Sequence, residues 1–249
     1  MKFHFKLEIA RGGYYFDEDN YLHPTTWFED RKTEPLVVAT EIHGKFIEIL
    51  HPFHDLVKAQ KTLKDYEGRI KYQKLFKLID KKDKTYNAEL ETQTKTKILE
   101  FVNSWGLGGY YEPESINPNH TLDGFIDEPH GKAQRPNLYN LLDKAVEMNG
   151  LLLDRNSYET VPPRLKEICN IHSFRLRPRI NGGLYMETDS IFTTMYWGMA
   201  FTEYTYEVKE CEWCEAPLLA DKRAIFCKPP RQCKNRFNNS KRTTKKGSK

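Results

Sequence analysis

The chain ends with CEWCEAPLLADKRAIFCKPPRQCKNRFNNSKRTTKKGSK, residues 211–249, and this stretch contains four of its five cysteines. Cys211 and Cys214 form a C-x2-C pair, and Cys227 and Cys233 follow twelve residues later as a C-x5-C pair. Two such pairs supply the four thiolates that a tetrahedral Zn²⁺ ion prefers. A short hairpin between the pairs would bring the second pair to the first. We therefore expect a zinc finger over residues 209–240.

A zinc ion at these cysteines is expected to be structural. Four thiolates close the coordination shell, whereas catalytic zinc keeps an open position and commonly uses histidine or carboxylate ligands. No histidine follows His172, so the finger offers no obvious proton carrier. Disulfides are disfavoured in a reducing compartment, and an iron–sulfur cluster is unusual in so short and basic a segment. Trp213, Phe226 and Phe237 are expected to pack the finger or, alternatively, to stack on bases.

Positive charge is concentrated at this end of the chain. The 249 residues carry a net charge of +4, but residues 222–249 contain eleven Lys and Arg and no Asp or Glu. Residues 1–221 contain 28 basic and 35 acidic residues. This asymmetry is typical of an arm that binds nucleic acid or an acidic partner, although a basic tail can also serve solubility alone. Residues 241–249 are predicted to be a basic disordered tail. The predicted nucleic-acid contacts are Lys228, Arg231, Lys234, Arg236, Lys241 and Arg242.

Residues 1–208 are expected to form an α+β body, a mixture of helices and strands that precedes the finger. Phe3, Phe5, Leu7 and Ile9 alternate with polar residues, and this predicts a strand. In LVVATEIHGKFIEIL, residues 36–50, two runs rich in β-branched residues flank His-Gly-Lys, and this favours a hairpin. We therefore expect strands and turns throughout residues 1–50.

The middle of the body, residues 51–150, is expected to be helical. After a first helix between residues 51 and 82, a second helix should cover 90–105 and end at the glycines that follow Trp105. Residues 106–135 are typical of a loop. Pro136 can open a third helix, which Gly150 should end. The first helix is predicted between His51 and Lys82 from apolar residues at helical spacing: Leu56, Val57, Leu63, Tyr66, Ile70 and Leu78.

The last part of the body, residues 165–208, is expected to contain a strand hairpin and a helix. ICNIHSFRLRPRI, residues 168–180, alternates enough to predict a strand, NGG a turn, and LYMET a return strand. Thr188 or Asp189 should cap a helix that runs to about Val208 and leads directly into Cys211. The buried stripe of this helix is predicted to be Phe192, Met195, Tyr196 and Met199.

An arginine-rich strand is the strongest candidate for chemistry. Arg175, Arg177 and Arg179 would point to one face of the strand, which is then either solvated or in contact with anions. His172 has the opposite parity but can reach the site from the start of the strand. Metal-independent RNA cleavage needs an acid, a base and cations for the phosphorane charge. We therefore take His172, Arg175, Arg177 and Arg179 as candidate catalytic residues, and an exposed edge strand guarded by charge as the equal alternative.

An acidic cluster in the predicted loop is less specific. It is more typical of an ordinary polar loop than of a metal site, and its members are Asp123, Asp127, Glu128 and His130.

The order of a helix, a C-x2-C pair, and a second cysteine pair followed by basic and aromatic residues resembles bacterial proteins with a C-terminal CGNR-like zinc finger. ILEFVNSWGLGG, residues 98–109, and YMETDSIFTTMYWGMAFTEY, residues 185–204, are similar to two helical segments of that group. The wider CKPPRQC spacing departs from the usual second pair. The resemblance implies a relationship to the ring-activated zinc-finger ribonuclease of antiphage defence. That relationship would bring a ring-like homo-oligomer, RNA as substrate and a phage ring-forming protein as trigger.

The sequence thus leads to two hypotheses about function. No apolar run approaches the ~20 residues of a membrane span, and the N-terminus does not have the pattern of an export signal, so we expect a cytoplasmic protein. The first hypothesis is a zinc-finger ribonuclease of bacterial antiphage defence. The alternative is a non-enzymatic regulator whose finger binds nucleic acid or a partner protein.

Overall fold

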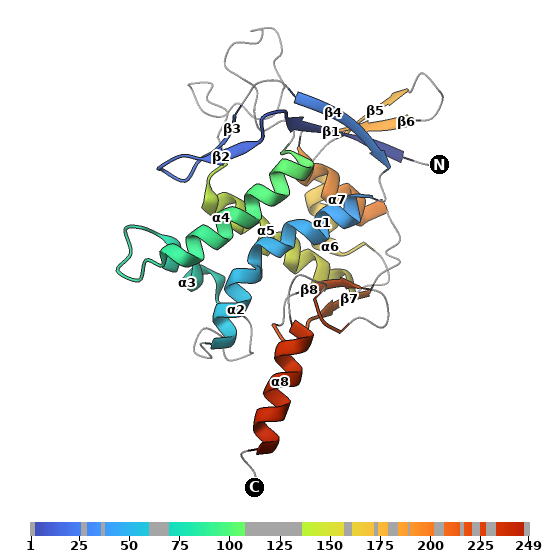
Figure 1. The fold of residues 1–249 in the computed structure, drawn as a ribbon. Helices are drawn as coiled ribbons and strands as arrows, with labels where there is room; N and C mark the ends of the chain where they lie inside the picture. Colours follow the sequence, from blue (N-terminus) through green and yellow to red (C-terminus); the bar gives the residue numbers. More distant parts are fainter. Residues whose placement is uncertain are drawn as a thin grey trace.

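The helices of the body support one face of a four-stranded sheet, and a small hairpin and a long helix lie at the opposite end (Figure 1). The structure is a computed structural model. The body contains both helices and strands, and four cysteines cluster near the C-terminus. The predicted fold class, an α+β body with a small C-terminal four-cysteine finger, is therefore confirmed. The structure describes residues 3–25, 29–35, 38–59, 70–107, 136–156, 161–171, 174–178, 184–188, 190–201, 207–214, 217–220, 225–227 and 233–246.

The large sheet combines strands from both ends of the body. Its order is β4-β1-β6-β5, with β1 antiparallel to β4 and parallel to β6, and β5 antiparallel to β6. Phe5 of β1 is paired with Met186 of β6, and both side chains are fully buried against the helices. The strand predicted from Phe3 to Ile9 is therefore confirmed. The strands are β1 (Phe3–Ala10), β4 (Glu29–Pro35), β5 (Arg175–Pro178) and β6 (Leu184–Glu187), and a separate hairpin is formed by β2 (Tyr14–Phe16) and β3 (Leu22–Pro24).

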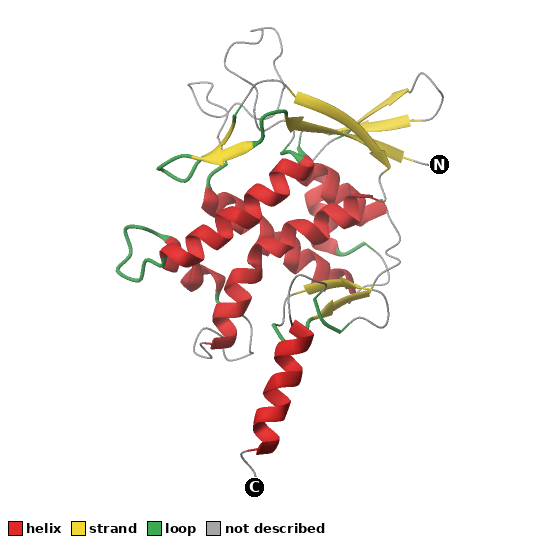
Figure 2. Ribbon diagram, in the orientation of Figure 1, coloured by secondary structure: helices red, strands yellow, loops and turns green. Residues whose placement is uncertain are grey.

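The helices pack beneath this sheet around a single core (Figure 2). Phe46 lies at the centre, because its ring is 4.9 Å from that of Phe101 and 5.1 Å from that of Phe192. These three rings join α1, α4 and α7. The helices of the body are α1 (Val38–Ile47), α2 (His51–Ala59), α3 (Tyr72–Phe76), α4 (Ala88–Trp105), α5 (Leu138–Asn156), α6 (Pro163–Ile171) and α7 (Ile191–Phe201), with single 3₁₀ turns η1 (Glu48–Leu50) and η3 (Lys77–Ile79).

The hairpin predicted within residues 36–50 is wrong, because 38–50 is helical in α1 and η1. Ala39, Ile42 and Phe46 recur at helical spacing and are at most 1% exposed. Their burial among α4, α5 and α7 outweighs the modest preference of β-branched residues for strands. His43, taken as part of a turn, is instead a fully buried helical residue.

The long helix predicted between 51 and 82 is also wrong. Its first part is α2, but Ile70 and Lys71 are not helical and α3 begins only at Tyr72. Leu63 and Tyr66 lie outside the described residues. The helix predicted at 90–105 is confirmed as α4. The Asn87 side chain caps it by accepting the N–H of Leu90 at 3.0 Å.

Three further boundaries differ from those predicted. The helix α5 continues through Gly150 to Asn156, because Leu151 and Leu152 remain in the core. Residues 168–171 belong to helix α6 and not to a strand, since Leu165 and Cys169 are buried one turn apart. The helix α7 ends at Phe201, and the strand β7 occupies Glu207–Glu210 before Cys211.

The cap and the buried stripe of α7 can also be compared with the prediction. The hydroxyl of Ser190 accepts the N–H of Thr193 at 3.2 Å, so Ser190 fills the capping role expected of Thr188 or Asp189. Asp189 lies outside the described residues. The predicted stripe is confirmed, because its four members are at most 2% exposed: Phe192, Met195, Tyr196 and Met199.

The crossing of α1 and α7 depends on a glycine. A Cβ atom at Gly198 would lie 2.5 Å from the Cβ of Ala39, which is too close for any real side chain. We expect Gly198→Ala to lower the free energy of unfolding by about 1–3 kcal/mol, because overpacking outweighs the gain in helix propensity. Chemical denaturation would measure this change.

Gly150 provides the matched control. It also lies within a helix, but a Cβ atom there would have only the flexible Arg164 guanidinium within reach, at 3.9 Å. Gly150→Ala should leave the free energy of unfolding unchanged or raise it by up to about 1 kcal/mol. Equal losses in both variants would contradict a specific clash at the helix crossing.

Candidate metal centre and basic surfaces

The C-terminal unit is a hairpin followed by a helix, and its cysteines lie where these elements meet. The strands β7 and β8 (Pro217–Ala220) are antiparallel, and the turn between them contains Cys211 and Cys214. The N–H of Glu212 donates to the carbonyl oxygen of Ile225 at 3.0 Å, which brings the segment containing Cys227 to this turn. Cys233 is the first residue of α8 (Cys233–Lys246).

The four thiols converge on one point. Their Sγ atoms all lie within 4.8 Å of one another, and all four residues are at most 8% exposed. Two of the separations are 3.5 Å, between Cys214 and Cys227, and 3.9 Å, between Cys233 and Cys214. Four sulfur atoms around one ion at about 2.3 Å are separated by about 3.8 Å in a tetrahedron. The predicted set of metal ligands is therefore brought together with the right dimensions.

The four thiols lie close enough to change one another's ionisation. Hydrogen bonds from Cys214 and Cys227 lower the pKa of the Cys211 thiol. Hydrogen bonding with Cys211 and Cys214 raises the pKa of the Cys227 thiol. One thiolate therefore forms easily and its neighbour does so with difficulty. A bound divalent cation would offset the repulsion between neighbouring thiolates, so that all four thiols could lose their protons. No disulfide links these cysteines, and 3.5 Å is far longer than an S–S bond.

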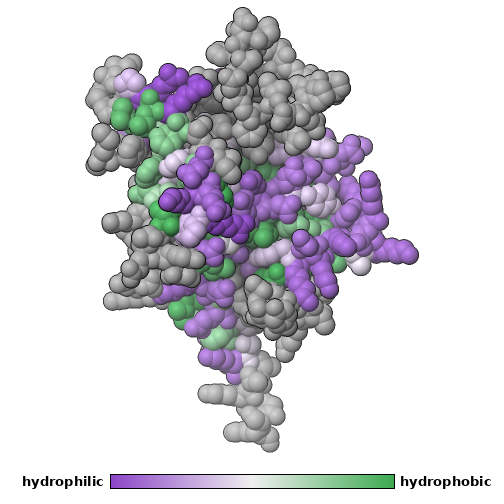
Figure 3. Space-filling model, turned by 180° about the vertical axis from the view of Figure 1, so that it is seen from behind, coloured by the Kyte–Doolittle hydropathy of each residue, from purple (hydrophilic) through white to green (hydrophobic). Residues whose placement is uncertain are grey.

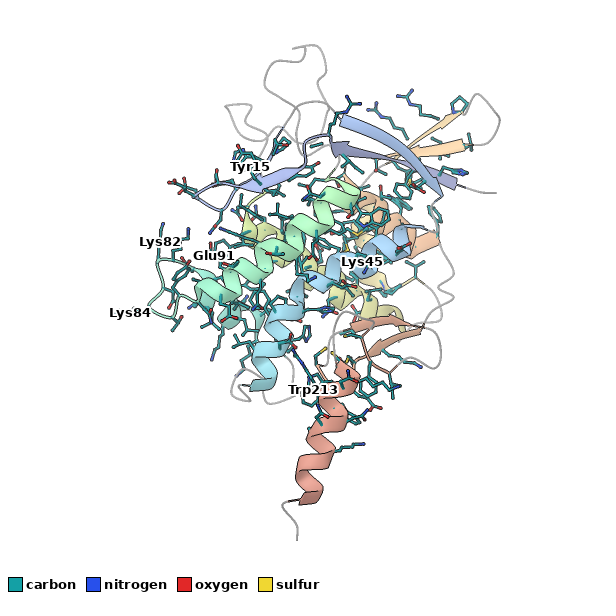
Figure 4. The ribbon with its side chains drawn as sticks, viewed as in Figure 1. Tyr15, Lys45, Lys82, Lys84, Glu91 and Trp213 are labelled. Carbon is teal, nitrogen blue, oxygen red and sulfur yellow. The ribbon has the colours of Figure 1, made fainter. Side chains whose placement is uncertain are left out.

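Aromatic side chains join α8 to the cysteine turn. Trp213 and Phe226 pack on the four cysteines, with Trp213 at the base of α8 (Figure 4). The Phe226 ring lies 5.2 Å from that of Phe237 in the second turn of α8. The Lys241 ammonium lies 4.2 Å from the centre of the Phe237 ring. Of the two expectations for these aromatic residues, the structure therefore favours packing.

The two faces of α8 differ in what they meet. Lys234 and Lys241 are seven residues apart, on one side of the helix, and both are exposed. Arg236 is on the opposite side, where its Nη1 atom lies 4.0 Å from Oδ1 of Asp55 in α2. The hairpin also contacts the body, with β8 against α1 and β7 against α5. Among the predicted nucleic-acid contacts, Arg236 is thus positioned to attach the finger to the body.

The remaining predicted contacts are placed only in part. Lys228 and Arg231 lie outside the described residues, and Arg242 belongs to α8 without a described side chain. The predicted disordered tail begins within this helix, because 241–246 are helical. Since β7 starts at Glu207, the C-terminal unit extends over 207–246 and is longer than the predicted finger.

The arginine-rich strand lies at the edge of the large sheet. All four residues of β5 are exposed, and Leu176 shares a row with the buried Met186 and Phe5 on the side facing the helices. Arg175 and Arg177 therefore project from the opposite face, which has no helix over it in the described part of the chain (Figure 1). The prediction that these two arginines share a face is confirmed. His172 and Arg179 lie outside the described residues.

Sequence reasoning missed His4 as a neighbour of this strand. His4 is paired with Tyr185, which in turn is paired with Arg177, so the three residues form one row across β1, β6 and β5. His4 alternates with the buried Phe5 and therefore lies on the same face as Arg177, roughly 10 Å away across two strand spacings. The alternation of residues 3–9 predicts that His4 lies on the face of β1 opposite Phe5. That this face continues to Arg177 follows only from the pairing of β1 with β6.

Two further histidines, His51 and His54, lie at the start of α2. The stretch HPFH begins helix α2, as expected of a helix entry, and His51 and His54 are buried. The Nε2 atom of His54 lies 3.0 Å from the hydroxyl of Tyr72, beside the junction with the finger. The loop cluster of Asp123, Asp127, Glu128 and His130 lies outside the described residues.

Comparison with known proteins adds no family to these observations. No protein-family model, curated protein or solved structure matches the chain. Among the described residues, no helix combines the length and apolar character needed to cross a membrane. The function is therefore argued from the metal centre and the two basic surfaces.

Proposed function

We propose that the C-terminal unit is a structural zinc module that binds RNA. The observation that carries this proposal is that four buried thiols lie at the base of a helix with exposed lysines. A closed shell of four thiolates favours zinc, and it leaves no open position for substrate. The metal would thus shape a binding surface and take no part in a reaction.

The charge distribution supports nucleic acid as the partner. The helix α8 contains six Lys and Arg and no acidic residue, whereas residues 1–221 have an acidic excess. A polyanion is attracted to such a helix and gains affinity through the release of counterions. Lys234 and Lys241 are exposed on one side of α8 and are the side chains of this helix that we expect to contact phosphates.

We further propose that bound RNA is cleaved on the helix-free face of the large sheet. Arg175 and Arg177 would stabilise the negative charge of the phosphorane. His4 or His172 would take the proton of the 2′-hydroxyl as its oxygen attacks phosphorus, and the 5′-oxygen would leave as the P–O bond breaks and receive a proton from solvent. Support comes from the exposure of both arginines and from the row that Arg177 shares with His4. Arg179, adjacent in the sequence, remains a candidate for the same role.

The biological setting of the proposal rests on the resemblance to zinc-finger proteins described above. It comprises a ring-like homo-oligomer, activation by a phage ring-forming protein, and antiphage defence in the bacterial cytoplasm. Native mass spectrometry of the metal-loaded protein, alone and with a candidate trigger, tests both the assembly and the metal content. A monomer under every condition would contradict the ring.

The alternative is a regulator that binds RNA or a protein without cleaving it. It is favoured by the position of Arg175 and Arg177 on an edge strand, because charged side chains commonly protect such edges from pairing with other chains. In that case the arginines would serve solubility, and only the finger would contact the partner.

Two paired substitutions separate binding from cleavage. Arg175→Ala with Arg177→Ala should lower the cleavage rate by roughly 10²–10³-fold, the loss typical of removing donors to a developing oxyanion, with RNA affinity nearly unchanged. Lys234→Ala with Lys241→Ala should instead weaken RNA binding. Gel-based cleavage and fluorescence anisotropy measure the two effects.

The controls decide between the two functions. Circular dichroism should be unchanged in both variants, because all four side chains are exposed. Cleavage that survives loss of Arg175 and Arg177 would remove this strand from the site. If RNA binds but is never cut with any trigger, the protein is a non-enzymatic regulator and the nuclease hypothesis is wrong.

A further inference from the structure

The segment of residues 70–86, from α3 to the turn before α4, concentrates positive charge on the otherwise acidic body. Residues 70–86 contain six lysines and only two aspartates. Hydrophilic side chains gather on the side of the molecule from which this turn projects (Figure 3). We call residues 80–86 the lysine turn. The exposed lysines in and beside it are Lys74, Lys77, Lys81, Lys82 and Lys84.

The shape of the lysine turn is fixed by its two aspartates. Oδ1 of Asp80 accepts the N–H of Lys82 at 3.0 Å. Oδ1 of Asp83 accepts both the N–H of Thr85 at 2.9 Å and its hydroxyl at 2.6 Å. The N–H of Asp83 donates to the carbonyl of Asp80 at 2.9 Å. The turn is thus preformed, and little conformational entropy would be lost when a partner binds.

Two lysines of this turn, Lys82 and Lys84, flank Asp83, whose carboxylate is hydrogen-bonded to Thr85. Lys82 and Lys84 lie at its outer edge (Figure 4). Among the described residues, no ion pair joins either one to an acidic side chain. Lys81 differs, because its Nζ atom lies 3.8 Å from Oε1 of Glu91. Of the three lysines within the turn, Lys82 and Lys84 are therefore better placed than Lys81 to meet an external anion.

An exposed aromatic ring accompanies these charges. Tyr86 is 41% exposed at the end of the turn. The carboxylate of Glu91 next to its hydroxyl raises the pKa of Tyr86, so the ring stays neutral. Glu91 itself is buried and is paired with Lys95 at 2.6 Å. An exposed ring next to cationic side chains is the combination that single-stranded nucleic acids bind, because every base has a face that can stack.

We propose that the lysine turn is a second contact surface for single-stranded RNA, with Lys82 and Lys84 on phosphates and Tyr86 stacked on a base. This inference rests on the proposed RNA binding by the finger and adds a site on the body. Lysines act here as point charges, so the contact would be independent of sequence. Bound at both surfaces, the strand would be held more tightly than by α8 alone.

The test is fluorescence anisotropy with a labelled single-stranded polyuridine oligonucleotide that is 2′-O-methylated to prevent cleavage. The full, metal-loaded chain is titrated from low to physiological salt. Lys82→Ala with Lys84→Ala should reduce the slope of log K against log salt by about 1.4, since each phosphate contact on a single strand contributes about 0.7. Lys45→Ala with Lys166→Ala removes the same charge from α1 and α6 and should leave the slope unchanged.

A second pair of variants tests the stacking. Tyr86→Ala should weaken binding by at least about fivefold, whereas Tyr86→Phe keeps the ring and should bind like the unmodified protein. Equal losses in the two variants would point to the hydroxyl and overturn the stacking contact.

The outcomes distinguish this inference from the function on which it rests. If the unmodified protein does not bind the oligonucleotide, the proposed RNA-binding function fails. If it binds and loss of Lys82 and Lys84 changes neither affinity nor slope, the finger function stands and the lysine turn is overturned. Vesicles rich in phosphatidylglycerol form a separate arm. Loss of vesicle binding in the lysine variant with unchanged RNA binding would overturn the proposal in favour of a membrane.

Discussion

Cys214→Ser should abolish metal binding and unfold the C-terminal unit while leaving the body folded. Cys214 is central to the cluster, with sulfur atoms of Cys227 and Cys233 at 3.5 and 3.9 Å. Among the described side chains, the small hydrophobic cluster of this unit consists of the four cysteines with Trp213 and Phe226 packed against them. So little apolar surface cannot stabilise a fold, and a structural zinc ion typically supplies about 10–16 kcal/mol.

Two measurements check this result. Elemental analysis should find about one metal ion per chain in the unmodified protein and none in the variant. Hydrogen exchange should become fast in α8 and remain slow in α1 and α4, whose core is separate from the cysteine cluster. A strong chelator should produce the same pattern.

The fifth cysteine offers a matched control. Cys169 is a buried free thiol in α6, outside the metal cluster. Cys169→Ala should keep the metal content and the protection of α8. Full metal content and a protected α8 in Cys214→Ser would show that the four-cysteine assignment is wrong.

Acid should destabilise the body through His43. Its side chain is fully buried in α1, and burial lowers its pKa from 6.5 to about 4, even though its Nε2 atom is hydrogen-bonded to the carbonyl of Met148 at 3.2 Å. Between these two pKa values the unfolded chain binds a proton that the folded chain does not. The free energy of unfolding should therefore fall as the pH is lowered from 6.5 to 4, by about 3 kcal/mol in total.

The contribution of His43 is isolated by comparison with a variant that does not titrate. His43→Gln retains an N–H group for Met148, so its free energy of unfolding should lose this part of the pH dependence. Urea denaturation at several pH values measures the difference between the two proteins, in which other titrating groups cancel. Parallel pH profiles would mean that His43 already accepts its proton in the folded state.

The sequence predicts features whose causes are local. The spacing of the four cysteines identifies the metal cluster, because ligand chemistry and a short turn define it. The glycine after Trp105 marks the end of α4 for the same reason, since its N–H bonds the helix's own backbone. The arginine alternation places Arg175 and Arg177 on one face as soon as the strand exists.

Features that depend on distant partners are not predicted. Residues 36–50 are rich in β-branched residues, and the helix at 38–50 is stabilised by burial against distant helices, including the packing of Phe46 on Phe101 and Phe192. The row from His4 to Arg177 requires a parallel pairing between the two ends of the body, which no local pattern encodes. The attachment of Arg236 to Asp55 is similarly invisible until α2 and α8 are in place.

The helix α8 projects from the molecule, and its far end lies away from the contacts at its base. Cys233, Arg236 and Phe237 in its first turns contact the finger and the body, and it projects from the end of the molecule opposite the large sheet (Figure 1). Its 14 residues extend about 21 Å, so a rotation of roughly 10° at the base moves the far end by roughly 4 Å. A small change at the metal or at Asp55 is thus amplified into a large change in where the outer lysines reach.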